Sequence, residues 1–281
     1  MRATGRPRRA LLVTAALVAV TFAAGCGQGS GSSPTTSGAE PSPTSSPEPT
    51  LDLSEVVFPA DAKVPALSEV PAPSSADPTT GGVPVSAAGV GVAGQGDVVV
   101  DVYFDFMCPY CGLFDQVNAA DLDALVAEGG VTVVFHPVAI LDRASDTAYS
   151  TRAMNAFAVV ADQAPDRVPD FVTALLAAGT QPAEGGHGLT DEQIAEAAQS
   201  VGVSTAVTDE FTATVRGVLG TGSSITTLRT FVPWTVAVTA LLPAHPDGTR
   251  GTPSVLVDGQ WFGGDWTQPG VLRAAVEAAR A

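Results

Sequence analysis

The fold is decided by the stretch Val98-Val99-Val100-Asp101-Val102-Tyr103-Phe104-Asp105-Phe106-Met107-Cys108-Pro109-Tyr110-Cys111. Its first half is rich in β-branched and aromatic residues, which predicts a buried or half-buried strand. The residues that follow it carry apolar side chains at helical spacing, at Leu113, Phe114, Val117, Leu122, Leu125 and Val126. The sequence therefore predicts a strand that delivers two cysteines to the first turn of a helix.

A helix N-terminus changes the chemistry of a cysteine placed there. Its unpaired N–H groups carry a partial positive charge of about +0.5, which favours a thiolate over a thiol. We therefore expect Cys108 to be exposed to solvent and its pKa to lie below that of an ordinary thiol. Pro109 fits the first helical position, because its missing N–H would have no partner there. Cys111 lies one turn further on, so the two cysteines are expected to form a dithiol/disulfide switch.

Two other roles are open to a Cys-x-x-Cys pair. Half of a zinc site would need a second cysteine pair, which the sequence lacks, and His136 has no obvious companion. An inert structural disulfide is compatible with an exported protein, but so short a loop gives little stabilisation in the loop-entropy account. Redox catalysis without a bound metal is the interpretation that these residues favour.

Residues 1–25 are typical of an export signal peptide, with arginines first and then an apolar run from Ala10 to Ala24. This run is too short to span a bilayer core of about 30 Å comfortably. It ends in Phe22-Ala23-Ala24-Gly25-Cys26, which resembles a bacterial lipobox except for Ala23, where leucine is usual. The resemblance implies that Cys26 is lipidated and anchors the protein to the cell membrane. Ordinary cleavage that leaves Cys26 as a spare thiol, or an uncleaved anchor, is the alternative.

Residues 26–82 are predicted to be a disordered tether and residues 83–281 the folded domain. The tether is rich in Gly, Ser, Thr and Pro, and runs such as Pro41 to Pro49 cannot bury enough apolar surface to offset the entropy of ordering.

The formal net charge of the chain is −16, which argues against nucleic acid as a partner.

A second strand is predicted from Val131 to Phe135, after the stop signal Gly129-Gly130. Two strands joined through a helix form a βαβ unit with parallel pairing. Near the C-terminus, Asp258-Gly259 lies between two apolar runs, Ser254–Val257 and Gln260–Phe262, which is a strong hairpin signal. A last helix is expected over residues 268–280.

An inserted helical region is predicted between these strands, over residues of about 142–248. Asp166 is expected to cap one helix, and Thr190–Gln193 forms a capping-box pattern at the start of another. A further helical stripe is indicated by Val207, Phe211, Val215 and Val218. Residues 224–242 are apolar but interrupted by Pro233, so one kinked helix and two separate pieces both stay open.

This order of elements resembles the thioredoxin fold of DsbA-like thiol–disulfide oxidoreductases, over roughly residues 87–281. The expected fold class is α/β: a central mixed sheet flanked by helices, with an inserted all-helical subdomain. The motif from Asp105 to Cys111 is similar to the active-site pattern of the exported DsbA-like branch. The run from Gly251 to Gly259 resembles the second signature of the family, a loop in which a cis proline faces the cysteines.

The resemblance implies roles for two residues of that loop. Pro253 would be cis, although Thr252-Pro253 taken alone would be an ordinary trans proline. The backbone of Thr252 would pair with bound substrate like an added strand.

The sequence departs from the family at two places. Many thioredoxin-fold oxidoreductases have a buried acid six residues before the first cysteine, where this chain has Val102. Asp105 has two interpretations, proton transfer to or from Cys111 or a solvated position at the end of the strand. Pro109-Tyr110 is also the glutaredoxin dipeptide, whereas strong oxidases of the family have histidine in the second place, which leaves the oxidising strength open.

The function that the resemblance implies is oxidation of cysteine pairs in unfolded exported proteins. No cofactor is expected, and a quinone-linked membrane partner would reoxidise the cysteines. Candidates for an apolar rim that meets unfolded chains are Phe106, Met107, Tyr110 and Trp266, for each of which core packing is an equal alternative. Two other functions stay open: a reductase or isomerase, for instance in cytochrome c maturation, and a non-catalytic peptide-binding lipoprotein with a structural disulfide. His136, His187 and His245 are expected in loops or on the surface.

Overall fold

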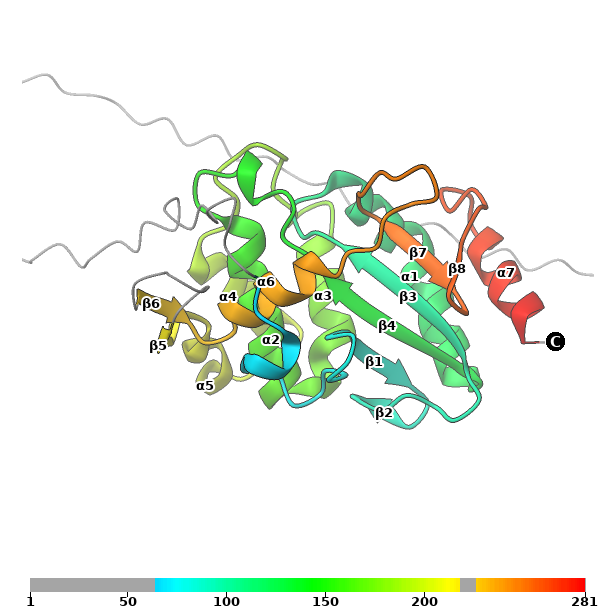
Figure 1. Cartoon of the computed structure of the whole chain (residues 1–281), viewed down its shortest axis with the longest axis horizontal. Helices are drawn as coiled ribbons and strands as arrows, with labels where there is room; N and C mark the ends of the chain where they lie inside the picture. Colours follow the sequence, from blue (N-terminus) through cyan, green and yellow to red (C-terminus); the bar gives the residue numbers. More distant parts are fainter. Residues whose placement is uncertain (1–63, 218–225, 281) are drawn as a thin grey trace, which may run out of the picture. The chain divides into compact units, whose positions relative to one another are not determined.

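The strand that precedes the cysteines lies inside a mixed β-sheet. The computed structural model describes residues 64–217 and 226–280, and in this part of the chain β3 (Val98–Phe104) belongs to a six-stranded sheet of order β2-β1-β4-β3-β7-β8 (Figure 1). Buried and partly exposed residues alternate strictly along β3, because successive side chains of a strand point to opposite faces. β4 (Val131–Pro137) pairs with β3 in parallel, as predicted for the βαβ unit.

On its other side β3 pairs antiparallel with β7 (Ser254–Val257), which continues through a tight turn into β8 (Gln260–Trp261). The turn residues Asp258 and Gly259 have φ values of 53° and 74°. Positive φ at both central residues is what a two-residue hairpin of the favoured twist requires, so the predicted hairpin is confirmed.

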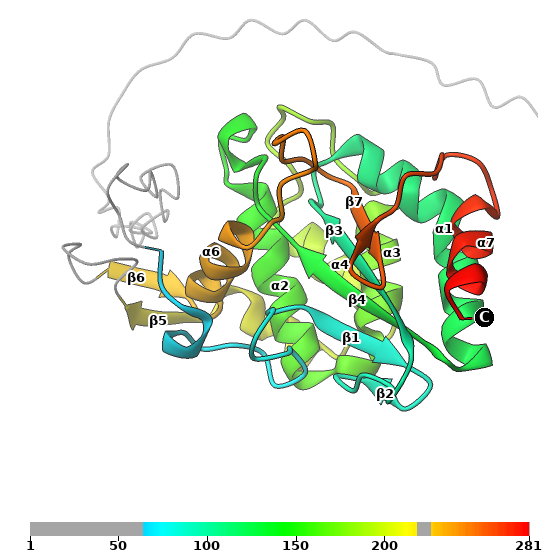
Figure 2. The ribbon, with the colours of Figure 1, turned by 45° about the vertical axis from the view of Figure 1, so that its right-hand side comes forward.

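Two helices cover one face of the sheet. α1 (Pro109–Glu128) carries the cysteines, and α7 (Val271–Ala279) lies beside it (Figure 2). Arg273 joins them, since its guanidinium donates to Glu128 at 2.7 Å and to Glu277 at 2.8 Å. The stop signal after α1 is also confirmed, because Gly129 and Gly130 both have positive φ.

The predicted start of the folded domain at Val83 is wrong, because residues 64–82 pack against the domain. Ser75 donates its hydroxyl to the Ala161 carbonyl at 2.6 Å. A Cβ on Gly82 would lie 2.3 Å from His136 Cε1, so only glycine permits this approach to β4. The segment leads into β1 (Val83–Ser86), which pairs antiparallel with β4 and with the two-residue edge strand β2 (Gly89–Val90). The predicted signal peptide, Cys26 and the remainder of the tether lie outside the described residues.

The inserted region, residues of about 142–248, is largely helical. Its helices are α2 (Tyr149–Gln163), α3 (Val168–Leu176), α4 (Asp191–Ser200), α5 (Thr205–Thr208) and α6 (Val232–Ala240), with short 3-10 turns at Leu67–Glu69 before it and at Asp142–Ala144, Pro165–Arg167 and Asp209–Thr212 within it. α2 is the centre of the insert, because nearly all of its residues are buried. The capping box at Thr190 is confirmed: Thr190 accepts from Gln193 N–H, and the Gln193 side chain accepts from Thr190 N–H.

Two local predictions within the insert need correction, and an open alternative at Pro233 is resolved. The insert is not all-helical, because β5 (Thr214–Gly217) and β6 (Thr226–Arg229) form an antiparallel pair; β-branched residues favour strands, and the predicted helical stripe ends where β5 begins. Asp166 caps no helix, because it lies within a 3-10 turn that starts at Pro165. Of the two alternatives left open around Pro233, the structure has two separate pieces, β6 and α6, and Pro233 lies in the first turn of α6, where a missing N–H has no cost.

Candidate active site

Cys108 and Cys111 lie at the junction between β3 and α1. Cys108 is the N-cap residue of α1, and Pro109 is the first helical residue, as predicted. The Cys108 carbonyl accepts hydrogen bonds from the backbone N–H of Cys111 at 2.9 Å and of Gly112 at 3.3 Å. Both cysteines are free thiols, so the structure shows the dithiol form of the pair.

The prediction of an exposed Cys108 is wrong, because only 5% of the residue is accessible. The loop before β7 lies over it, and the Cys108 thiol donates to the Thr252 carbonyl at 3.3 Å. The pKa of Cys108 is lowered to about 6, chiefly by the hydrogen bond from the Cys111 thiol, with further contributions from the Thr252 side chain and from backbone N–H groups of α1. The predicted acidic thiol is therefore present, in a more enclosed setting than expected.

Cys111 has the opposite character. It is 0% exposed, and burial raises its pKa well above that of an ordinary thiol. The backbone N–H of Asp105 points to its sulfur at 3.5 Å. The two cysteines therefore differ in protonation. Cys108 can exist as a thiolate near neutral pH, whereas Cys111 stays a protonated thiol.

Asp105 is fully buried, which excludes the solvated position at the end of the strand. Its Oδ1 accepts from the Met107 N–H at 2.9 Å and from the Ser150 hydroxyl at 2.6 Å, and its Oδ2 accepts from the Leu141 N–H at 2.9 Å. Burial raises the pKa of Asp105 to about 7, a value at which a carboxyl can both give and take a proton near neutral pH. Val102, in the place of the usual buried acid, is a buried apolar residue.

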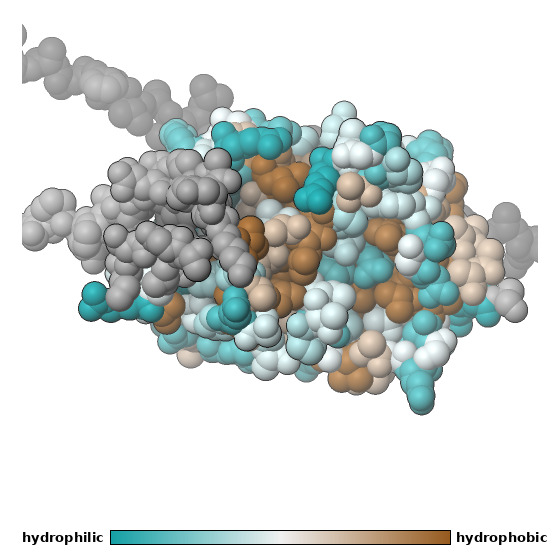
Figure 3. Space-filling model, viewed as in Figure 1, coloured by the Kyte–Doolittle hydropathy of each residue, from teal (hydrophilic) through white to brown (hydrophobic). Residues whose placement is uncertain are grey.

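The predicted apolar rim is only partly present. Phe106 and Met107 are buried core residues, so for these two the core-packing alternative holds. Tyr110, between the cysteines, is 63% exposed, and Leu113 one turn on is also exposed. Trp266 is partly buried and packs edge-on against Phe114, with ring centroids 5.8 Å apart. On the face drawn in Figure 3, apolar residues are interspersed with polar ones.

The loop before β7 has the geometry that the family resemblance implied, since the Thr252–Pro253 peptide bond is cis. The hydrogen bonds that hold this loop in place were not predicted from the sequence. The Ser254 hydroxyl donates to the Gly251 carbonyl at 2.6 Å, so His245 Nε2 must donate to Ser254 Oγ at 2.9 Å. The His245 ring also stacks on Trp261, with centroids 4.0 Å apart.

The other two histidines have separate surroundings. His136 is buried in β4, where it pairs with Asp101 at 2.8 Å and stacks on Tyr103, which contradicts the expected surface position. His187 is exposed, as expected, and pairs with Asp146.

A second residue missed from the sequence is Gln181, in the turn after α3. Its side-chain amide donates to the Phe106 carbonyl at 3.2 Å and to the Cys108 carbonyl at 2.9 Å. No local signal could have identified it, because a single glutamine in a loop 70 residues after the motif has no pattern of its own.

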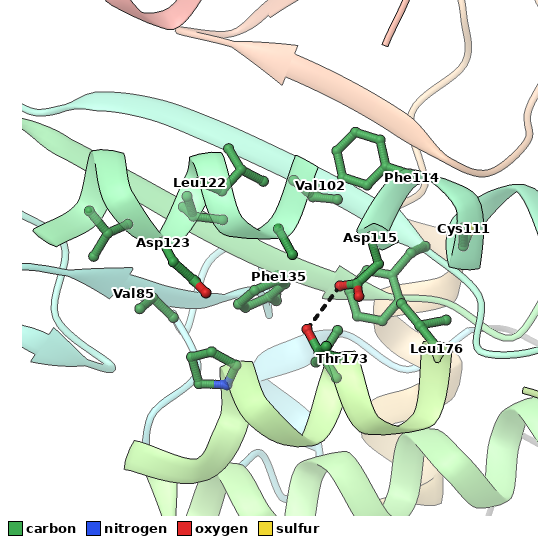
Figure 4. A pocket seen from close by; sticks show the side chains of 16 residues that line it. Val85, Val102, Cys111, Phe114, Asp115, Leu122, Asp123, Phe135, Thr173 and Leu176 are labelled. Atoms are coloured by element: carbon green, nitrogen blue, oxygen red, sulfur yellow. Dashed lines mark hydrogen bonds between the residues drawn. The ribbon is translucent and has the colours of Figure 1, made fainter. Parts of the chain in front are cut away.

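A pocket of about 540 Å³, part of it open to solvent, lies between α1, α3 and the sheet (Figure 4). Its lining is mostly apolar and includes Cys111. Asp115 also lines it and accepts from the Thr173 hydroxyl at 3.1 Å, and burial raises the pKa of Asp115 to about 6. The pocket therefore borders the buried cysteine of the pair, and Cys108 is not among its lining residues.

Metal sites and membrane spans can be assessed for the described residues alone. Among residues 64–217 and 226–280, no three His, Cys, Asp or Glu side chains are grouped so that they could hold a metal ion. In the same ranges no helix combines the length and the apolar character needed to cross a bilayer.

The fold and the paired thiols define a thioredoxin-fold dithiol protein. Residues 99–218 match the family described as DSBA-like thioredoxin domain. The structure is similar to reduced DsbG, a disulfide bond oxidoreductase of Mycobacterium tuberculosis, with 27% identity, a TM-score of 0.56, and coverage of 70% of this chain and 86% of that one. It is also similar to oxidised DsbA of the same organism, with 28% identity, a TM-score of 0.56, and coverage of 71% and 93%.

Residues 99–218 of the chain thus match a DSBA-like thioredoxin domain, and the fold is the one found in the thiol–disulfide oxidoreductases DsbG and DsbA. The predicted resemblance and the α/β thioredoxin-like fold class are confirmed, with the insert corrected as described above. Among curated proteins, the serine/threonine-protein kinase PknE of Mycobacterium tuberculosis is 37% identical over 106 residues, which are 37% of this chain and 19% of the kinase. The chain therefore spans about a fifth of the length of the curated relatives that it matches.

Proposed function

We propose that this protein is a membrane-tethered extracytoplasmic oxidase that forms disulfides in exported proteins through Cys108 and Cys111. The observation that carries the proposal is the opposite acidity of the two thiols, with a Cys108 pKa of about 6 and a Cys111 pKa well above the ordinary value. A thiolate that is stable near neutral pH stabilises the reduced enzyme, and a stable reduced form makes the disulfide a stronger oxidant.

The reaction starts from the Cys108–Cys111 disulfide. A substrate thiolate attacks the Cys108 sulfur, the disulfide between the cysteines breaks, and Cys111 leaves and takes up a proton. Asp105, buried beside Cys111 with a pKa of about 7, is the proposed proton donor. A second substrate thiolate then attacks the substrate sulfur of the mixed disulfide, and Cys108 leaves as a thiolate. The substrate loses two electrons and gains a disulfide, and the enzyme is left as the dithiol.

The neighbouring residues support binding and turnover in this proposal. Tyr110 offers an exposed apolar surface next to Cys108. The backbone of Thr252, whose carbonyl already lies at the Cys108 sulfur, would pair with an extended substrate segment. Lipidation of Cys26 and a tether that ends near residue 64 would hold the domain at the membrane, where a quinone-linked partner reoxidises it.

The equilibrium between the purified full chain and glutathione tests the direction of electron flow. A redox potential near about −120 mV supports the oxidase, whereas a potential near about −270 mV supports a reductase on the same fold. Turnover is then measured as disulfide formation in a reduced, unfolded ribonuclease. The Cys108→Ala variant is expected to have no activity, and full activity of that variant would instead support a structural disulfide in a peptide-binding lipoprotein.

A further inference from the structure

The helical insert reaches the redox pair through the side chain of Gln181. The backbone turns sharply after α3, where the Gln181 N–H donates to the Ala177 carbonyl at 2.8 Å. From this turn Gln181 Nε2 donates to two carbonyls, those of Phe106 and Cys108. These carbonyls lie where the chain leaves β3 and enters α1, so one side chain of the insert holds the backbone on which Cys108 is mounted.

Gly112, the residue directly after the motif, leaves room for the Gln181 side chain. A Cβ built on Gly112 would lie 2.2 Å from Gln181 Oε1 and 2.9 Å from the Leu176 carbonyl oxygen. Glycine inside a helix costs about 1 kcal/mol relative to alanine, so helix stability does not explain a glycine at position 112. The close approach of the Gln181 side chain explains it.

Gln181 also acts on the charge distribution around the sulfur. The Cys108 carbonyl accepts three donors, two from the backbone of α1 and the third from Gln181 at 2.9 Å. A carbonyl oxygen close to a thiolate repels it, and each N–H bound to that oxygen offsets part of the repulsion. The backbone donors are present in any helix that starts here, whereas the third donor depends on the insert.

We propose that Gln181 is a positioning residue for the redox reaction: by binding the Phe106 and Cys108 carbonyls it fixes Cys108 at the start of α1 and stabilises its thiolate. The inference rests on the proposed function and adds to it a role for the insert. It assigns Gln181 no contact with substrate.

Two substitutions in the full chain separate hydrogen bonding from packing. Gln181→Ala removes the side chain, and Gln181→Met keeps a similar volume without a donor. In both we expect the Cys108 thiolate, followed by its ultraviolet absorbance, to form at higher pH than in the wild type. We also expect the equilibrium constant for oxidation of glutathione to fall about tenfold, which corresponds to about 30 mV.

Gln199→Ala is the matched control, because Gln199 is a glutamine of the same insert whose amide donates to Thr208 Oγ1 at 2.9 Å, in α4 and α5. It should lower the unfolding temperature without moving the thiolate titration. Wild-type titration in both Gln181 variants, a change in Gln181→Ala alone, or an equal change in Gln199→Ala would each overturn the inference. A wild-type chain that exchanges no thiol with glutathione contradicts the proposed function instead, and the titration still tests Gln181.

Discussion

Cys108 and Cys111 differ in reactivity because they differ in surroundings. The pKa of Cys108 is lowered to about 6, whereas burial raises that of Cys111. In a reduced chain that carries Cys26→Ser, alkylation by iodoacetamide should therefore label Cys108 alone, with a rate that is half-maximal near pH 6. Mass spectrometry of the labelled peptides measures it. A half-maximal rate near pH 9, or equal labelling of Cys111, would show that the thiols are not differentiated.

Asp105 should make the stability of the oxidised protein fall as pH rises. Its folded-state pKa of about 7 lies above the ordinary carboxyl value of 3.8, so between these values the unfolded chain is ionised while the folded one is protonated. The stabilisation is complete below about pH 4 and is lost as pH rises through about 7. Urea unfolding across this range measures the slope.

Asp105→Asn should remove this contribution and also lower stability at every pH. The amide has one acceptor oxygen where the carboxyl has two, so one of the three donors from Met107, Ser150 and Leu141 loses its partner. An unsatisfied buried donor costs about 1–3 kcal/mol. An unchanged pH slope in the variant would mean that Asp105 is ionised throughout.

At the scale of elements, α1 is placed by the tight contact at Gly112. Gly112→Ala should destabilise the protein by about 1–3 kcal/mol, although alanine favours helices, because the added Cβ meets Gln181 Oε1 at 2.2 Å and the Leu176 carbonyl oxygen at 2.9 Å. In a Gln181→Ala background the cost should shrink, since one of the two obstructions is gone. A double-mutant cycle of unfolding free energies measures this coupling, and strict additivity would contradict it.

The elements that the sequence predicted are those with local signals. The β-branched run of β3, the Asp-Gly turn between β7 and β8, and the Thr190 capping box each contain their own cause within a few residues. The same holds for the cysteines at the N-terminus of α1, because Pro109 marks the first helical position. The cis proline was foreseen from family resemblance and not from physics.

The features that could not be predicted from the sequence depend on tertiary contacts. Residues 64–82 have the composition of a linker, but Ser75 and Gly82 fit the domain at positions that no local pattern marks. Phe106 and Met107 lie beside the motif, where exposed and buried apolar residues look alike in the sequence. Both are buried, and the Phe106 ring packs against Phe157 of the insert. Gln181 and His245 act across long separations in the chain, so only the folded structure brings them to the site.

At the scale of the whole domain, the insert makes two sets of hydrogen bonds to the active-site segment, one to the Asp105 side chain and one to the backbone around Cys108. Leu141, just before the insert, and Ser150 within it donate to the Asp105 carboxyl, and Gln181 of the insert donates to the carbonyls of Phe106 and Cys108. The end of β3 and the start of α1 are thus fixed by a region inserted between β4 and β7 in the sequence. Movement of the insert would therefore change the backbone on which Cys108 is mounted and the surroundings of Asp105 together.

Residues 64–82 should behave as part of the domain in a truncation experiment. Their removal would break the hydrogen bonds of Ser74 and Ser75 to Asp162 and Ala161 and the packing of Leu67 against the core. Full burial of such a side chain contributes about 1.5–3 kcal/mol, so the partly buried Leu67 contributes less. Each kcal/mol shifts the melting temperature of a domain of this size by about 2–4 °C.

A chain that starts at residue 64 should therefore melt with the full chain, whereas a chain that starts at residue 83 should melt about 3 °C or more lower, because the hydrogen bonds are lost along with the packing of Leu67. Calorimetry of the three oxidised proteins makes the comparison. The chain starting at 64 is the control for loss of the predicted tether. If the two truncated chains melt together, residues 64–82 contribute nothing to stability, and the domain boundary belongs at Val83 after all.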